Sequence, residues 1–298
     1  MIRYTVRLAD LNRHHFEVLC HIENPVAEQR FSLPSWIPGS YLLREFARHI
    51  VSIRAESDGR EIDVEKVSKG TWCCRGADSS LSVTIVVYAL DRSVRGAYLD
   101  GQRGYFNGTC LFLCPEGLEQ QPVEVLLETP CDPRCESWRI ATAMVPKDVD
   151  QNGFGLYRAE NYDELIDHPV EMSDFSDAAF KVAGVPHLLV IAGRHRTDLE
   201  RIALDLTQLC EAHVDLFGRP PPFDSYCFLG LAVGEGYGGL EHRASSSLIF
   251  SRDDLPKIGQ PDIPRDYQRF LSLCSHEYFH TWNVKRIKPK TFTPYLLD

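Results

Sequence analysis

Hydrophobic and polar positions alternate with a period of two along the first half of the chain. The pattern is clearest at residues 2–8 and 15–22, where every second side chain is apolar. Such alternation is typical of β-strands with one buried face. Further runs of this kind, separated by Gly-, Asp- and Pro-rich turns, are found at residues 61–67, 81–90, 123–127 and 138–144. The first half therefore predicts an all-β, sandwich-like domain.

Helical periodicity begins only after about residue 165. Thr197 can cap a helix that runs to about Phe217, and Gly218 with the prolines that follow it would end that helix. The apolar residues of the segment fall on one stripe, at intervals of three and four. A second helix is expected from Pro264 onward.

Strands alternate with these helices in the second half. Two are expected at residues 225–233 and 245–250, with a glycine-rich turn at residues 234–239 between them. We therefore predict an α+β chain, in which an N-terminal β domain at residues 1–165 precedes a mixed domain at residues 166–298.

The composition is that of a soluble globular protein. The 298 residues are 44% hydrophobic with a formal net charge of −10, which argues against a nucleic-acid surface because such a surface needs clustered Lys and Arg. No segment has the roughly 20 apolar residues of a membrane helix, and the N-terminus resembles a strand, not a signal peptide. We therefore expect a cytoplasmic protein that binds neither nucleic acid nor membrane.

The ten cysteines are expected to be reduced in that compartment. Two C-x3-C pairs, Cys110/Cys114 and Cys131/Cys135, are a minor candidate for a structural zinc site. Because no His accompanies them, reduced core or loop cysteines are the favoured interpretation.

The main chemical signal is the segment His276-Glu277-Tyr278-Phe279-His280 on the second expected helix. Residues four apart share one helix face, so both imidazoles can bind a single ion. Glu277 lies about 100° around the helix, where its carboxylate can deprotonate a metal-bound water. This arrangement predicts a zinc peptidase site, with His276 and His280 as ligands and Glu277 as catalytic base. The plain alternative is two surface histidines and a glutamate on an ordinary helix.

A second group of residues, Gly238-Gly239-Leu240-Glu241-His242, precedes this motif. A glycine pair lets a backbone come close to a ligand, and its amides could hydrogen-bond a peptide or an oxyanion. Glu241 offers a carboxylate to a cation such as the free α-amine of a peptide, which would make the enzyme an aminopeptidase. A tight turn with a solvated glutamate explains the same residues equally well.

Two longer stretches resemble a known family. Residues 276–289, HEYFHTWNVKRIKP, are similar to the active-site stretch of the glycyl aminopeptidase family, gluzincin zinc metallopeptidases that often carry a C-terminal PDZ domain. Residues 36–49, WIPGSYLLREFARH, resemble the hallmark of that family's N-terminal β domain. Within them Trp36, Tyr41 and the arginines could line a substrate cleft, although a structural loop is favoured.

The resemblance extends from about residue 3 to residue 298. It implies a thermolysin-like zincin catalytic domain after the β domain, and zinc-dependent removal of N-terminal residues, with Gly and Ala preferred. By this match His276 and His280 would be zinc ligands, Glu277 the catalytic base, and Glu241 a candidate for binding the amine of a peptide substrate with a free N-terminus. Gly238 and Gly239 would belong to the same substrate-binding segment.

The chain departs from the family pattern after His280. Gluzincins take their third zinc ligand from a Glu on a later helix, but no Glu follows Glu277, and Asp298 is the only carboxylate downstream. We therefore expect a catalytic domain truncated after the motif helix, with weak zinc binding and little or no peptidase activity. The alternative is a non-catalytic peptide-binding or scaffold protein that retains part of a peptidase fold. A zinc endopeptidase is a third interpretation.

Overall fold

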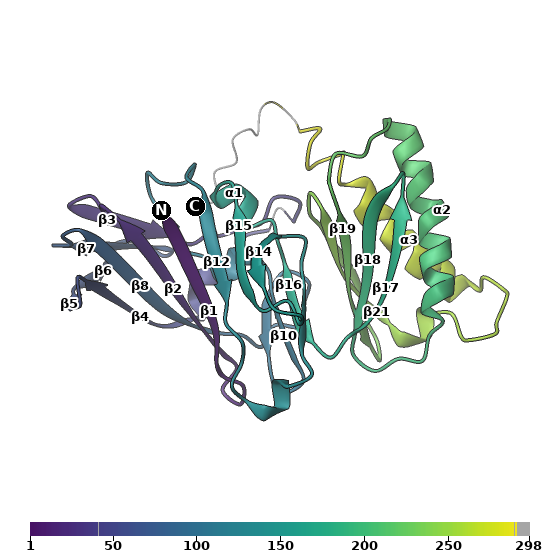
Figure 1. Ribbon diagram of the computed structural model, residues 1–298, viewed down its shortest axis with the longest axis horizontal. Coiled ribbons are helices and arrows are strands. Elements are labelled where there is room, and N and C mark those ends of the chain that lie inside the picture. The colour runs from purple at the N-terminus through teal and green to yellow at the C-terminus, as the bar shows by residue number, and fades with distance from the viewer. Residues whose placement is uncertain (41, 289, 291–298) are drawn as a thin grey trace. The chain divides into compact units, whose positions relative to one another are not determined.

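A computed structural model describes residues 1–40, 42–288 and 290. The chain divides into two compact units, the first of which holds Met1–Ile140 and Met144–Ser173. The second holds Ala141–Ala143 and the described residues from Asp174 onward. Strands dominate, and both long helices lie in the second unit (Figure 1). The predicted α+β class is confirmed. The sequence predicts the boundary between the two domains near residue 165.

An eight-stranded sheet is the largest element of the first unit. Its strand β2 shows why the segment forms: Phe16, Val18, Cys20 and Ile22 are buried, and the residues between them face outward. In spatial order the strands are β14 (Val145–Val149), β15 (Gly155–Ala159), β12 (Val123–Leu127), β1 (Ile2–Asp10), β2 (His15–Glu23), β8 (Ser80–Tyr88), β4 (Ile50–Ser57) and β5 (Arg60–Ile62).

Two four-stranded sheets accompany it. One orders β13 (Arg139–Ala141), β16 (Val170–Ser173), β10 (Arg103–Phe106) and β9 (Ala97–Leu99), and the other orders β11 (Cys114–Pro115), β3 (Glu28–Ser32), β7 (Thr71–Arg75) and β6 (Val64–Lys66). Aromatic side chains join the layers, since the ring of Phe106 meets Phe16 edge-on at 5.7 Å and Phe112 at 5.8 Å. The short helices are η1 (Phe46–His49), η2 (Gly108–Cys110), η3 (Pro133–Cys135) and α1 (Tyr162–Leu165).

A five-stranded sheet with two helices on one face forms the second unit (Figure 1). Its central strands are parallel and both edge strands are antiparallel to their neighbours. The order is β17 (Ser176–Val182), β18 (Val185–Ala192), β19 (Tyr226–Val233), β21 (Ser245–Ser251) and β20 (Tyr237–Glu241), and the helices are α2 (Leu199–Phe217), η4 (Arg252–Asp254) and α3 (Arg265–Phe279). Within the ranges described, no helix has both the length and the apolar character needed to cross a membrane.

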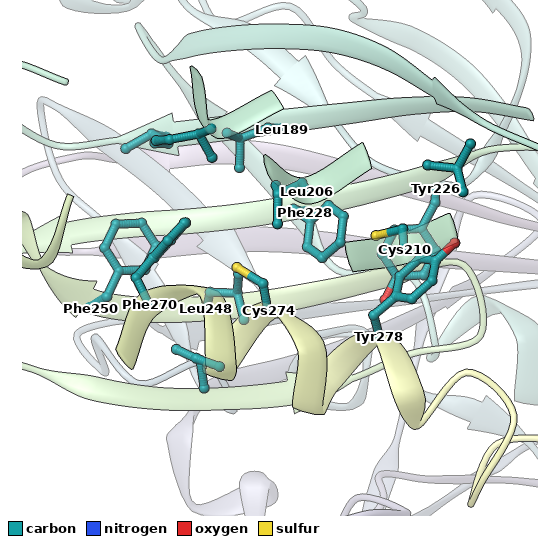
Figure 2. Packing of buried hydrophobic residues seen from close by; sticks show 14 of the residues in the cluster. Leu189, Leu206, Cys210, Tyr226, Phe228, Leu248, Phe250, Phe270, Cys274 and Tyr278 are labelled. Atoms are coloured by element: carbon teal, nitrogen blue, oxygen red, sulfur yellow. The ribbon is translucent and has the colours of Figure 1, made fainter. Parts of the chain in front are cut away.

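The core of this unit lies between the sheet and the two helices. Figure 2 shows Phe270 beside Phe250 in one part of this core, and Tyr278 with Cys210 and Tyr226 in another. The α3 residues in this core recur at intervals of three and four, as the sequence pattern predicts. This packing fixes which face of α3 is left for the polar residues of the motif.

Two local predictions were wrong. Asp198, not Thr197, caps α2: its side chain accepts a hydrogen bond from the amide of Arg201, while the Thr197 hydroxyl donates to the carbonyl of Pro256 at 2.7 Å. The expected glycine-rich turn at residues 234–239 ends early, because its last residues belong to strand β20.

His187 joins β18 to α3 inside this core. Its Nδ1 donates to the carbonyl of Val185 at 3.0 Å, so its Nε2 accepts from the hydroxyl of Tyr278 at 3.0 Å. The ring is 2% exposed and stacks on Tyr226. Burial lowers the pKa of His187 from 6.5 to about 4. The ring is therefore neutral at neutral pH, with its proton on Nδ1.

Acid is expected to destabilise the second unit through His187. Because the folded-state pKa of about 4 lies below the ordinary value of 6.5, the contribution of the neutral ring is complete above pH 6.5 and is lost as the pH falls towards 4. The free energy of unfolding should fall by up to ~1.4 kcal/mol per pH unit in this window. Urea unfolding of the parent and of His187→Gln measures this at about pH 7, 5.5 and 4.5.

Carboxylates titrate alike in both proteins, so their contribution cancels in the difference between the two free energies of unfolding. The stability advantage of the parent over His187→Gln should therefore shrink as the pH falls. If the two proteins lose stability in parallel, His187 is not the titrating group.

Candidate functional site

His276 and His280 lie one turn apart at the C-terminal end of α3. Their Nε2 atoms are 3.0 Å apart, and the two rings are nearly perpendicular, at 88°. Two nitrogens bound to one tetrahedral zinc ion lie about 3.3 Å apart. The pair therefore fits a single ion with a movement of a few tenths of an ångström.

A backbone carbonyl fixes the tautomer of His280. Its Nδ1 lies 2.7 Å from the carbonyl oxygen of Asn283, to which it donates. The lone pair of its Nε2 is therefore directed towards His276, as metal binding requires. Helix α3 ends at Phe279, so the acceptor belongs to the turns that follow the helix.

Glu277 completes the group. The potential ligand atoms of His276, Glu277 and His280 all lie within 4.8 Å of one another, and in the part of the chain described they are the one such group found. The side chain of Glu277 is 4% exposed, whereas His276 is exposed. A buried carboxylate beside an accessible imidazole pair is the arrangement that activation of a metal-bound water needs.

Gly239 leaves the space that Glu277 occupies. A Cβ at position 239 would lie 2.0 Å from Oε1 of Glu277 and 2.4 Å from its Cδ, distances that real atoms do not adopt. At Gly238 a Cβ would meet only the Cγ2 of Ile249, at an ordinary 3.5 Å. The sequence prediction treated both glycines as part of a turn. They lie in strand β20, and a side chain at position 239 would have to displace the Glu277 carboxylate from the place that it occupies.

Glu241 lies two residues further along the same face of β20. Gly239 pairs with Leu248 and Glu241 with Ser246 of β21, and because Leu248 packs in the core beneath α3, all of these face the helix. Glu241 is 6% exposed, and its side chain forms no hydrogen bond or ion pair with any residue that the structure describes. A buried carboxylate without a partner is costly unless a cation binds it.

The groups behind the motif stay neutral. Burial raises the pKa of Tyr226, Cys274 and Tyr278 above their ordinary values. Tyr226 and Ser246 share a hydrogen bond of 2.5 Å between their hydroxyls. The helix thus has a neutral face towards the core and carries Glu277 on the side that meets β20.

The sequence also singles out residues outside this site. Arg44 lies in the first unit, where its amide donates to the carbonyl of Ser35 at 2.7 Å and its guanidinium to Ser40 at 3.1 Å. Tyr41 and Asp298 lie outside the described residues. Two features had no signal in the sequence: the carbonyl that orients His280, because every residue has one, and the contact between Gly239 and Glu277.

The chain is similar to known peptidases. A model of the peptidase M61 N-terminal domain matches residues 3–174, and one of the M61 glycyl aminopeptidase matches residues 269–298. The crystal structure of an aminopeptidase N family protein from Idiomarina loihiensis is similar with a TM-score of 0.97 and 45% identity. The match covers 100% of this chain and 50% of that chain, so this chain spans about half its length. No curated protein matches the chain.

Replacing Gly239 by alanine should displace Glu277 from the imidazole pair. The new methyl group would overlap the carboxylate, which is the end of a flexible side chain, so we expect Glu277 to move and the free energy of unfolding to fall by about 1 kcal/mol. Gly238→Ala is the matched control, since its methyl group finds ordinary contact and should cost less than Gly239→Ala. Thermal unfolding of both variants and a crystal structure of Gly239→Ala measure the effect. An unmoved Glu277 in that crystal structure would be inconsistent with the packing described.

Proposed function

Because this chain belongs to the peptidase M61 family, we propose that it carries the catalytic motif of a zinc-dependent aminopeptidase. The observation that supports this most is the meeting of two imidazole nitrogens at 3.0 Å, with the carboxylate of Glu277 beside them. His276 and His280 would hold the ion through Nε2. The hydrogen bond from His280 to the carbonyl of Asn283 would keep its ring in the binding orientation.

A zinc ion bound there would lower the pKa of a coordinated water towards about 7 and polarise the scissile carbonyl. The residues of the chain would handle the protons. Glu277 would accept a proton from the attacking water and later pass it to the leaving amine. Because Gly239 leaves room for it, this carboxylate can lie close to the imidazole pair without exposure to bulk water.

Glu241 would bind the free α-amine of the substrate. Its carboxylate is buried, no Lys, Arg or His in the described part of the chain forms an ion pair with it, and it lies on the face of the sheet that α3 covers. A protonated amine would supply the missing positive charge, which explains why a carboxylate is tolerated there. The substrate is then a peptide with a free N-terminus. Following the family resemblance, we propose Gly or Ala as its first residue. The ten cysteines, all free thiols, suit a reducing cytoplasm.

A polypeptide of these 298 residues should bind zinc weakly and turn over little substrate. Catalytic zinc sites normally use three protein ligands, and among the residues that the structure describes the imidazole pair is accompanied only by Glu277, which is assigned as the base. Isothermal titration with zinc measures the affinity. Binding should be lost in His280→Ala and unchanged in His21→Ala, which removes an imidazole from strand β2. Tight one-to-one binding of zinc by the parent would contradict the prediction of weak zinc binding. Zinc binding that survives His280→Ala would contradict the assignment of His280 as a ligand.

Blocking the substrate amine should weaken peptide binding to the zinc-loaded chain. Alanyl peptides with a free and with an acetylated N-terminus can be compared by titration calorimetry, with the parent and with Glu241→Gln. We expect acetylation to cost the parent about tenfold or more in affinity and to cost Glu241→Gln much less. Glu235→Gln, which changes an exposed residue just before β20, is the control. Equal binding of free and acetylated peptides by the parent would favour an endopeptidase or a scaffold.

A further inference from the structure

Arg269 lies on the same stripe of α3 as the two histidines, about two helical turns before His276. Its guanidinium lies over the ring of Tyr237, 4.3 Å from the centroid. Its Nη1 is 4.0 Å from Oδ2 of Asp254, at the limit of an ion pair, and its side chain is 50% exposed. No hydrogen bond joins this guanidinium to any residue for which the structure gives a position. Its N–H donors are therefore available to a ligand.

Strand β20 gives the bound peptide a direction. Tyr237, Gly239 and Glu241 alternate along the face that meets α3. If Glu241 binds the amine and the scissile carbonyl lies near Glu277, which is against Gly239, the peptide runs from Glu241 past Gly239 towards Tyr237. An extended peptide advances about 3.3–3.6 Å per residue. The part beyond the scissile bond therefore comes within reach of the Arg269 guanidinium after one or two residues.

We propose that Arg269, held in place by Tyr237, binds a carboxylate on the leaving part of the substrate, within two residues of the scissile bond. This inference rests on the proposed function, because the direction of the peptide follows from the role of Glu241. A guanidinium offers its N–H groups in a fork that matches the two oxygens of a carboxylate. The guanidinium carbon lies over the tyrosine ring, a cation–π contact that holds the group in place.

Two sources supply such a carboxylate: the C-terminus of a di- or tripeptide, and the side chain of an Asp or Glu that follows the first residue. Either would bind against the formal net charge of −10 of the chain. A preference for the anionic ligand is therefore evidence for a local cation and not for general attraction.

The test is calorimetric binding of short peptides to the zinc-loaded full chain. The panel holds Ala-Phe and Ala-Gly-Phe as free acids and as C-terminal amides, the pair Ala-Asp-amide and Ala-Asn-amide, and acetylated Ala-Phe. The proteins are the parent, Arg269→Gln, Arg269→Lys, Tyr237→Phe and the control Arg196→Gln, an exposed arginine in the loop before α2. Tyr237→Phe keeps the ring and should behave as the parent.

We expect the parent and Arg196→Gln to bind acids about three- to tenfold more tightly than amides. Arg269→Gln should bind acids and amides equally, and Arg269→Lys should keep only part of the preference, because it retains the charge without the fork. A preference for Ala-Asp-amide over Ala-Asn-amide identifies a side-chain carboxylate, whereas a preference limited to the free acids identifies the C-terminus.

The two proposals fail in different ways. If acetylation weakens binding while acid and amide bind the parent equally, the role of Arg269 is overturned and the amine site stands. An acid preference that persists in Arg269→Gln also overturns it. If neither acetylation nor amidation changes the affinity, or if no peptide binds, the proposed function fails and the inference about Arg269 fails with it.

Discussion

The close approach of strand β20 to Glu277 is the constraint on which the site depends. Packing of α3 against the five-stranded sheet pushes this carboxylate into the backbone of the edge strand, and only the missing side chain of Gly239 makes the contact sterically allowed. The contact fixes the carboxylate beside the two imidazoles. Glu241 lies two residues further along the same face of β20, so one packing interaction positions the two imidazoles and both carboxylates relative to one another.

The apolar and the polar residues of helix α3 lie on different faces of the helix. Phe270 and Tyr278 belong to the buried stripe and fix the helix on the sheet through aromatic contacts. The hydroxyl of Tyr278 also donates a hydrogen bond to His187. Arg269 and the two histidines occupy a different stripe. Because the apolar stripe decides how the helix is rotated, a change in the core would rotate both imidazoles together relative to strand β20 and Glu241, even though neither histidine is altered.

Much of the fold could be predicted from the sequence, because the pattern of buried apolar residues decides which segments form strands and helices. Alternation predicted β2, helical spacing predicted α3, and the stretch from His276 predicted the family, which the comparisons confirm. The glycines were assigned to a turn because glycine usually marks one, and the carboxylate that lies against Gly239 belongs to a residue far along the chain. The cap of α2 was misplaced by one residue because Thr and Asp are both good caps, and tertiary contacts decide between them.

The atom that orients His280 is a main-chain oxygen, contributed by Asn283. Such an acceptor is present whatever the amino acid, provided the backbone keeps its path. Evolution can therefore vary the side chain at that position without losing the orienting hydrogen bond. For a protein engineer the same position is a place to attach a probe close to the two imidazoles while the orientation of the His280 ring is preserved.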